Sequence, residues 1–181
     1  RSTLFPYTTL FRSSINKYRD ATYNTRVFLL TGSSFALNGG SLESRLSYVY
    51  NNKCDRISIT KDTEKVTYLW AYNYMYPVAE IRGATYDELV SWGLSTNISN
   101  LATMTTTANV SSALTTIRSS LASRPVLMTS YTYDPLIGIT SATAPNGTKT
   151  SYTYDVMGRL SNVTNHGGNI IRHHSYNYKT N

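Results

Sequence analysis

Cysteine, histidine and acidic side chains are scarce in this 181-residue chain, which has one cysteine, three histidines and ten aspartates and glutamates. A single cysteine excludes a disulfide within the chain. Cys54 is therefore expected to be a small buried hydrophobic residue or a thiol that pairs with another part of a longer protein. Long apolar runs are also missing, and none approaches the roughly 18 residues of a membrane-spanning helix. The sequence thus predicts no membrane span.

Positive charge is in excess but is not concentrated. Of the seven net positive charges, two come from Arg1 and Arg12, and the remaining +5 is distributed along the chain. A nucleic-acid groove would need its basic residues on one stripe, together with aromatic side chains that stack on bases. We therefore interpret the basic residues as a solvated surface and expect no nucleic-acid partner.

The first thirteen residues, RSTLFPYTTLFRS, resemble the translation of a sequencing adapter rather than a natural protein segment. The alternative is a natural arm or part of a signal peptide, but Pro6 interrupts the apolar run and no small-residue cleavage site follows. We interpret residues 1–13 as an artefactual tail and expect the fold to begin at Ser14. The true N-terminus, with any signal peptide, would then lie outside this chain.

Tyrosine is the most informative residue that is present, with 16 tyrosines against four phenylalanines. Together with abundant threonine, serine and asparagine, it is typical of half-exposed strands and their turns. Residues 14–83 are predicted to be a β-rich region, with turns at 38–40 and 51–53 and with Pro77 at a strand end or edge. The candidate strands are residues 26–30, 46–50, 56–60 and 66–76.

Residues 84–124 have a helical pattern. Thr85 and Glu88 have the spacing of a capping box, and Gly93 can end the short helix that follows. Pro125 prevents a helix from continuing into the next segment. A second helix is predicted from apolar residues at spacings of four, three and four, which are Val110, Leu114, Ile117 and Leu121. We expect this helical insert to pack its apolar stripe on the sheet.

Residues 125–181 contain an internal repeat. The sequence YTYD at residues 131–134 recurs 21 residues later at 152–155, and each copy is followed by apolar residues and a glycine. A third, degenerate copy, YNYK, opens at Tyr176. Each unit is predicted to be a strand pair, because Asn146-Gly147 and the Gly-Gly-Asn at 167–169 favour hairpin turns. If successive repeats pair side by side, their tyrosines would form aromatic ladders on one face.

The fold class that follows is mainly β, with antiparallel hairpin repeats that form part of a twisted sheet or shell and a small helical insert around residues 85–123. The residues expected to carry the repeat structure are tyrosines, aspartates and glycines, with the end of the second motif. They are Tyr131, Tyr133, Asp134, Gly138, Tyr152, Tyr154, Asp155, Gly158, Arg159, Leu160, Tyr176 and Tyr178.

The sequence YDVMGRL at residues 154–160, followed by a Gly-Gly-Asn turn and Tyr176-Asn177-Tyr178, resembles the Y-D-x-x-G-R-L repeat of bacterial Rhs/YD-repeat proteins. Residues 68–86 are similar to the segment that precedes these repeats in one bacterial branch. The resemblance implies a large secreted or cell-surface protein whose repeats spiral into a β-sheet shell. In some members the shell encloses a C-terminal toxin, and others serve in surface contact or carbohydrate binding. No toxin activity carries over, because only two clear repeats are present and no toxin-like segment follows them.

No catalytic, cofactor or metal site is expected. His166, His173 and His174 invite a metal hypothesis, but the last two would point to opposite faces of a strand and no Cys/His ligand spacing exists. Asp134 and Asp155 could be a catalytic carboxylate pair, but an aspartate after a repeat tyrosine is better explained as a hydrogen-bond acceptor in a turn. We therefore expect a structural module and not an enzyme, with the rest of its own protein as its partner.

The alternative function is binding. Exposed tyrosines stack well on sugars and at protein interfaces, so the tyrosine-rich sheet could bind glycans or a cell-surface partner.

Overall fold

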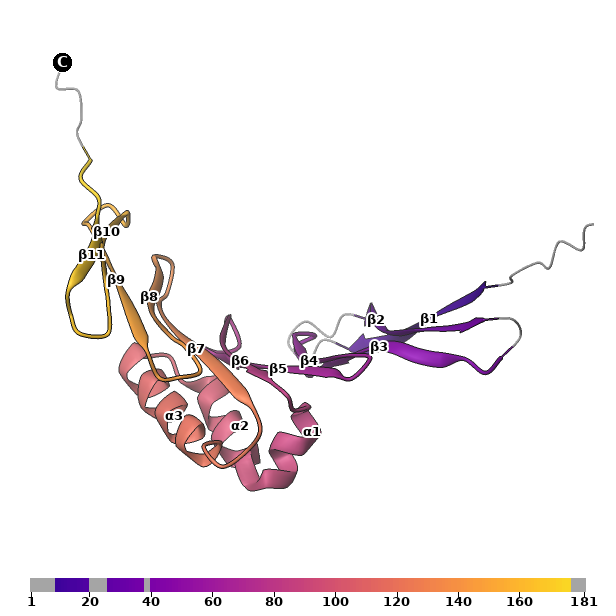
Figure 1. Ribbon diagram of the computed structural model, residues 1–181. Coiled ribbons are helices and arrows are strands. Elements are labelled where there is room, and N and C mark those ends of the chain that lie inside the picture. Colours follow the sequence, from indigo (N-terminus) through magenta and orange to yellow (C-terminus); the bar gives the residue numbers. More distant parts are fainter. Residues whose placement is uncertain (1–8, 20–25, 38–39, 177–181) are drawn as a thin grey trace, which may run out of the picture.

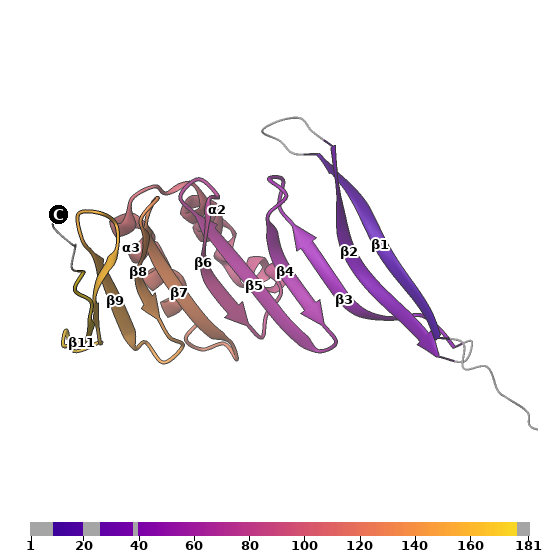
Figure 2. The same ribbon diagram turned by 90° about the horizontal axis from the view of Figure 1, so that it is seen from above.

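The computed structural model describes residues 9–19, 26–37 and 40–176. Within them, eleven strands form one antiparallel sheet whose spatial order is the chain order, with β1 and β11 at its two ends. The strands are β1 (Thr9–Arg19), β2 (Arg26–Leu37), β3 (Glu43–Tyr50), β4 (Arg56–Lys61), β5 (Glu64–Ala71), β6 (Tyr76–Arg82), β7 (Leu127–Asp134), β8 (Gly138–Thr143), β9 (Lys149–Tyr154), β10 (Leu160–Thr164) and β11 (Ile170–His173). The predicted fold class is confirmed: the sheet is twisted, open and built from hairpins (Figures 1 and 2).

In the chain, the helical insert follows β6 and precedes β7. In space it covers one face of the sheet (Figure 2). It contains α1 (Tyr86–Leu89), the π-helical turn η1 (Val90–Leu94), α2 (Ser95–Thr103) and α3 (Thr107–Ser120). The helix that starts at the predicted capping box of Thr85 and Glu88 is interrupted at Gly93, whose φ is 85°. Because a side chain disfavours that backbone conformation, glycine suits the point where the chain turns into α2.

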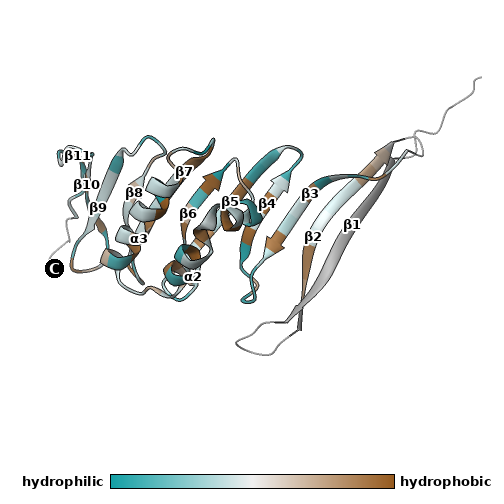
Figure 3. Ribbon diagram, turned by 90° about the horizontal axis from the view of Figure 1, so that it is seen from below, coloured by the Kyte–Doolittle hydropathy of each residue, from teal (hydrophilic) through white to brown (hydrophobic). Residues whose placement is uncertain are grey.

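The hydrophobic core lies between these helices and the middle of the sheet. In Figure 3, α2 and α3 lie over the strands, with α2 against β5 and α3 against β7. Leu69 on β5, Ile81 on β6 and Met128 on β7 are each at most 4% exposed. The predicted stripe on the second helix is buried against them, with Val110 and Ile117 fully covered. The apolar stripe thus packs on the sheet as expected.

One predicted strand is wrong. Residues 66–76 were expected to be continuous, but Tyr72, Asn73 and Tyr74 have φ values of 54°, 57° and 65° and form a turn between β5 and β6. The residue types at 72–74 do not indicate a turn, because tertiary contacts stabilise it. Tyr72 is 2% exposed and packs in the core. Pro77, expected at a strand end or edge, lies inside β6 next to a register shift, where a ladder hydrogen bond is not required of it.

Other boundaries differ from the prediction. Helix α2 was not predicted, although Leu94, Ile98 and Leu101 recur at helical spacing and are all buried. Strand β2 continues seven residues beyond the predicted end at Leu30. Strand β1 begins at Thr9, so part of the segment interpreted as an adapter-derived tail is paired with β2. The turn predicted at residues 38–40 lies mostly outside the described residues, as does Tyr178.

Candidate functional site: the contacts between successive hairpins

In the described part of the sheet, four hairpins have turn ends with the same pairing pattern. They are β3–β4, β5–β6, β7–β8 and β9–β10. In each, the first strand brings an aromatic residue opposite a residue at or near the start of the second strand. At this point the pairing shifts by one residue, so that the second strand carries a bulge beside the pair. The four pairs are Tyr50 with Arg56, Trp70 with Pro77, Tyr133 with Ile139, and Tyr154 with Leu160.

Each of these aromatic residues donates a hydrogen bond to a backbone carbonyl on the second strand of the preceding hairpin. Where the preceding hairpin is one of the four, the acceptor is the residue paired with that hairpin's own aromatic residue. We call these contacts the aromatic bridges. Tyr176, which follows β11, donates a fifth bond of the same kind, so the described residues contain five of them. They are Tyr50 Oη to Leu30 O (2.9 Å), Trp70 Nε1 to Arg56 O (3.1 Å), Tyr133 Oη to Pro77 O (3.1 Å), Tyr154 Oη to Ile139 O (2.8 Å) and Tyr176 Oη to Leu160 O (3.0 Å).

The turn at the end of the β9–β10 hairpin is held by Asp155. Its amide donates to Arg159 O (2.8 Å), and the Gly158 amide donates to Asp155 O (2.9 Å). The Asp155 carboxylate accepts from the backbone amides of Met157 (2.9 Å) and Arg159 (3.0 Å). Gly158 has a φ of 73°, which is the left-handed position of a three-residue hairpin loop. The aspartate and the glycine of the motif therefore both form the turn.

Arg159 connects this turn to the next aromatic bridge. Its guanidinium donates to Asp155 Oδ2 from Nε (2.8 Å) and from Nη2 (2.5 Å), and its Cζ lies 4.2 Å from the centre of the Tyr176 ring. The hydrogen bonds from Arg159 hold the pKa of Asp155 below its ordinary value. Leu160, the next residue, supplies the carbonyl that Tyr176 bonds to. The arginine and the leucine of the motif thus both position the tyrosine of the following unit.

The same turn occurs at residues 51–55, where the sequence was predicted to contain a turn but not a repeat. Asn51 accepts from the amides of Lys53 (2.9 Å) and Asp55 (2.9 Å), as Asp155 does from its own neighbours. Cys54, with a φ of 67°, takes the place of Gly158. The Asn51 side-chain amide donates to Asp55 Oδ2 (3.0 Å), which replaces the ion pair of the later turn. The sequence signal that was missed is YVYN at 48–51, which matches the spacing of YTYD.

The turn of the first clear repeat is built differently. In residues 134–138 the positive φ falls on Leu136 (71°), and the Leu136 amide donates to Tyr76 Oη (3.2 Å). Gly138 is not equivalent to Gly158. It occupies the position that Arg159 holds in the next unit, immediately before the residue whose carbonyl accepts the aromatic bridge. In the described part of the chain the Asp134 carboxylate has no hydrogen bond like those of Asp155.

The predicted ladder of repeat tyrosines is not formed in the described residues. Strand β8 lies between β7 and β9, so the two YTYD segments are not neighbours. Tyr133 instead contacts Tyr72 and Tyr76 of the preceding hairpin, with ring centres 6.1 Å and 4.8 Å away. Tyr72 Oη also accepts from the Tyr133 amide and donates to the Tyr133 carbonyl (both 2.9 Å). The helical insert contributes here, because Thr107 Oγ1 donates to the same carbonyl (2.6 Å).

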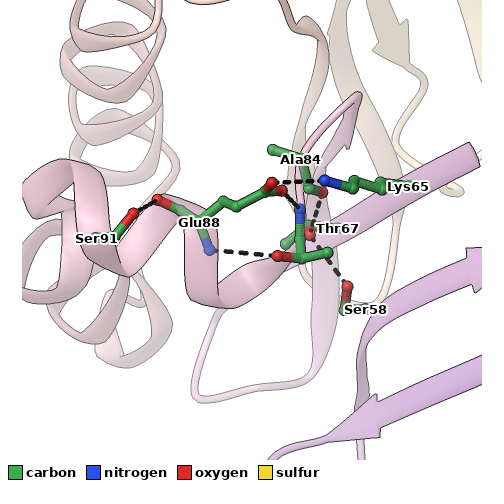
Figure 4. Close-up of polar contacts among 7 residues, drawn as sticks. Ser58, Lys65, Thr67, Ala84, Glu88 and Ser91 are labelled. Carbon is green, nitrogen blue, oxygen red and sulfur yellow. Dashed lines mark hydrogen bonds and ion pairs between the residues drawn. The ribbon is translucent and has the colours of Figure 1, made fainter. Parts of the chain in front are cut away.

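Polar contacts fix the start of the insert on the sheet (Figure 4). Glu88 and Thr85 form both bonds of the capping box, and Lys65 of β5 lies 2.5 Å from Glu88 Oε1. The hydroxyl of Thr67, which is fully buried, donates to Ala84 O (2.8 Å). The hydrogen bond from Lys65, followed by those from Thr85, holds the pKa of Glu88 below its ordinary value. The insert is therefore anchored by the central strands.

The three histidines lie at the last strands. His166 is in the turn between β10 and β11, where its Nδ1 accepts from the Lys149 amide (3.3 Å). His173 Nδ1 lies 2.7 Å from Asn162 Oδ1, and His174 follows β11. Within the residues described by the structure, no three His, Cys, Asp or Glu side chains are grouped as a metal site would need. No helix in those residues is long and apolar enough to span a bilayer.

The sheet and its bridges define a repeat protein whose unit is a β-hairpin joined to the preceding hairpin by an aromatic residue. Comparison with protein families finds that residues 138–170 match the model of the RHS Repeat, a segment that runs from the start of β8 into β11. This segment is similar to an RHS repeat, and the match supports the predicted resemblance to the Rhs/YD-repeat proteins. No curated protein matches the chain.

Proposed function

We propose that this chain is a structural module of a large bacterial Rhs/YD-repeat protein, secreted or displayed at the cell surface, in which it builds part of a β-sheet scaffold or shell. The observation that carries the proposal is the recurrence of the aromatic bridge, from Leu30 to Tyr176. From Arg56 onward, each acceptor carbonyl belongs to the residue that lies opposite the aromatic donor of its own hairpin. Because the same contact recurs at the same place in each hairpin, each hairpin is added to the preceding one in the same way. An extended sheet of repeats is built in this manner.

The energetics of such a module come from neighbouring hairpins. In a repeat sheet each unit contacts only its neighbours, so its stability is roughly the sum of units and interfaces. One hydrogen bond of this kind contributes about 1 kcal/mol, which is small for a single bridge and substantial when the bridge recurs. The module needs no catalytic group for this role, and its natural partner is the adjoining part of its own protein.

A carbohydrate-binding role for the motif tyrosines is less well supported. Tyr133 and Tyr154 are half-buried, and their hydroxyls already donate to backbone carbonyls. Tyr131 and Tyr152 are also half-buried, but their hydroxyls form no hydrogen bond in the described part of the chain, so these two residues remain for such a face. A glycan array that lost its signal on substitution of these two residues would favour the binding role over the scaffold.

Hydrogen exchange tests the scaffold proposal. Tyr154→Ala removes the bridge between β9 and β8 and leaves the helix-covered strands β5 to β7 untouched. We expect faster amide exchange in β8 to β11, with unchanged protection in β5 and β6, because local opening follows the contacts that hold each unit. Tyr152→Ala is the matched control on the same strand. Equal exchange in both variants would contradict a bridging role for Tyr154.

A further inference from the structure

A small pocket of about 170 Å³ lies between α2 and strand β5, and we call it the α2 socket. Three aromatic residues from three different segments line it, namely Trp70, Tyr74 and Tyr86. None of the described residues that line it is charged. Its apolar floor consists of residues that are each at most 9% exposed, which are Ile57, Leu69, Ile98 and Ala102. The α2 socket is therefore suited to a neutral ligand with an apolar ring.

The walls of the α2 socket are fixed by hydrogen bonds within the chain. The turn after β5 is tied to the end of α2, because the Tyr72 amide donates to Met104 O (2.7 Å) and the Tyr74 amide to Ala102 O (3.2 Å). On the other side, the side chain of Asn51 is held by the contacts of its own turn. A ligand therefore meets a preformed pocket and does not have to order it.

The rim of the α2 socket carries donors that the fold does not use. Tyr74 and Tyr86 are half-buried, and in the described part of the chain neither hydroxyl has a hydrogen-bond partner. Burial, followed by the neighbouring Tyr74, raises the pKa of the Tyr86 hydroxyl, so this group is partly removed from water. A polar group that is withdrawn from water without a partner is unfavourable. An acceptor on a ligand would relieve this cost.

We propose that the α2 socket binds a proline ring of an extended, proline-rich peptide, with the hydroxyls of Tyr74 and Tyr86 donating to carbonyl oxygens of that peptide. Pockets that hold whole small molecules usually have about 300–1,000 Å³, so this smaller volume suits one ring of a longer ligand. Proline brings a carbonyl acceptor but no N–H, and it therefore leaves no donor unpaired over the apolar floor.

Two further considerations favour a proline-rich peptide. Such segments form a polyproline II helix before they bind, and they dock in grooves that are lined by aromatic side chains. A sugar ring is also neutral, but its hydroxyls would need hydrogen-bond partners that the apolar floor does not provide. The α2 socket belongs to the helical insert and the strands beneath it. Its binding role is additional to the scaffold and does not depend on it.

An NMR titration of the full chain with a hexaproline peptide and with a Gly-Ser repeat of the same length, both blocked at their ends, tests the proposal. We expect the hexaproline peptide to shift the amide signals of Ser99 and Ala102 and to bind at least about tenfold more tightly than the Gly-Ser peptide. Ser99 is exposed and lines the α2 socket, so Ser99→Trp should obstruct it and weaken binding by at least about tenfold. The matched control is Asn100→Trp, at an exposed neighbour on α2 that does not line the socket, and it should change binding by less than about twofold.

Tyr86→Phe tests the donor, because it keeps the ring and removes the hydroxyl. We expect hexaproline to bind about three- to tenfold more weakly to this variant, and Tyr131→Phe, at a distant strand, to leave its affinity unchanged. Circular dichroism of Ser99→Trp separates loss of binding from loss of the fold.

The proposal is overturned if hexaproline shifts no signal at the α2 socket, or if the Gly-Ser peptide binds equally well. Unchanged binding in a folded Ser99→Trp variant would place the peptide elsewhere, and unchanged binding in Tyr86→Phe would remove the assigned donor. Methyl β-D-glucoside serves as a last probe. If it shifts the same signals and binds as tightly as hexaproline, the α2 socket does not select proline.

Discussion

The phenolic oxygen of Tyr154 lies 2.8 Å from the carbonyl oxygen of Ile139. To reach it, the ring passes over the residue before, and a Cβ on Gly138 would lie 2.5 Å from Tyr154 Oη and 2.9 Å from Cζ. The corresponding position in the next unit holds Arg159, whose guanidinium stacks on Tyr176 instead. In these two units the residue before the acceptor carbonyl therefore determines what the incoming ring packs on, the bare backbone of Gly138 or the guanidinium of Arg159.

Tyr154→Phe tests the hydrogen bond alone, because it keeps the ring and removes the donor. We expect a loss of about 1 kcal/mol in the free energy of unfolding, measured by urea denaturation, since Ile139 O is left without this partner. Tyr152→Phe removes a hydroxyl without such a bond from the same strand and should cost less than about 0.5 kcal/mol. Equal losses in the two variants would count against the bridge.

Gly138→Ala tests whether the close packing of the Tyr154 ring on Gly138 requires a glycine there. The added methyl group would overlap the Tyr154 side chain, and overpacking of this kind typically costs about 1–3 kcal/mol. The cost should largely disappear when Tyr154→Ala is already present, because the clashing ring is gone. Thermal unfolding of the two single variants and the double variant gives the coupling energy. Additive effects would mean that Gly138 matters for some reason other than Tyr154.

The sequence predicted the repeats where their residues are conventional. The repeat of YTYD with a following glycine marked the units, and the turns at Asn146-Gly147 and at residues 167–169 indicated the hairpins β8–β9 and β10–β11. The spacing of Val110, Leu114 and Ile117 indicated α3 and its buried face. Both signals are local, because turn-forming residues and a helical spacing of apolar residues can be recognised within a short stretch of sequence. They could be found without knowing what lies across the sheet.

The aromatic bridges could not be predicted in this way. Each joins residues that the bulge and the register bring together, and Trp70 in one unit does what a tyrosine does in the others. The residues at 50–56 are equally hard to recognise, because Asn51 replaces the aspartate and Cys54 replaces the glycine. The spacing of YVYN at 48–51 is a weak sequence signal, and the shared hydrogen-bond pattern shows that the repeat extends upstream of the helical insert.

Cys54 and Gly158 offer a reciprocal test of that equivalence. Both hold the left-handed position of the same turn, at φ values of 67° and 73°. A side chain there is unfavourable, so Cys54→Gly should stabilise the chain by about 0.5–1 kcal/mol and Gly158→Cys should destabilise it by about the same amount. The measurement is urea unfolding of both variants under reducing conditions. Changes of the same sign in both variants would contradict the equivalence of the two turns.

Asp155 makes the stability of the last repeat depend on pH. The hydrogen bonds from Arg159 lower the folded-state pKa of this carboxyl, so its stabilising effect is fully present above the unfolded value of about 3.9 and is lost as the pH falls through the folded value. Between pH 5 and pH 2, the free energy of unfolding should therefore fall more for the parent chain than for Asp155→Asn.

Glu88, whose pKa is also lowered, is present in both proteins, so its contribution cancels in the comparison. Arg159→Met provides the control: without the guanidinium, the difference between Asp and Asn at position 155 should lose most of its pH dependence. A difference that persists in the Arg159→Met background would show that the backbone amides of the turn, and not Arg159, govern the carboxylate. A parent chain that parallels Asp155→Asn across the whole range would refute the linkage.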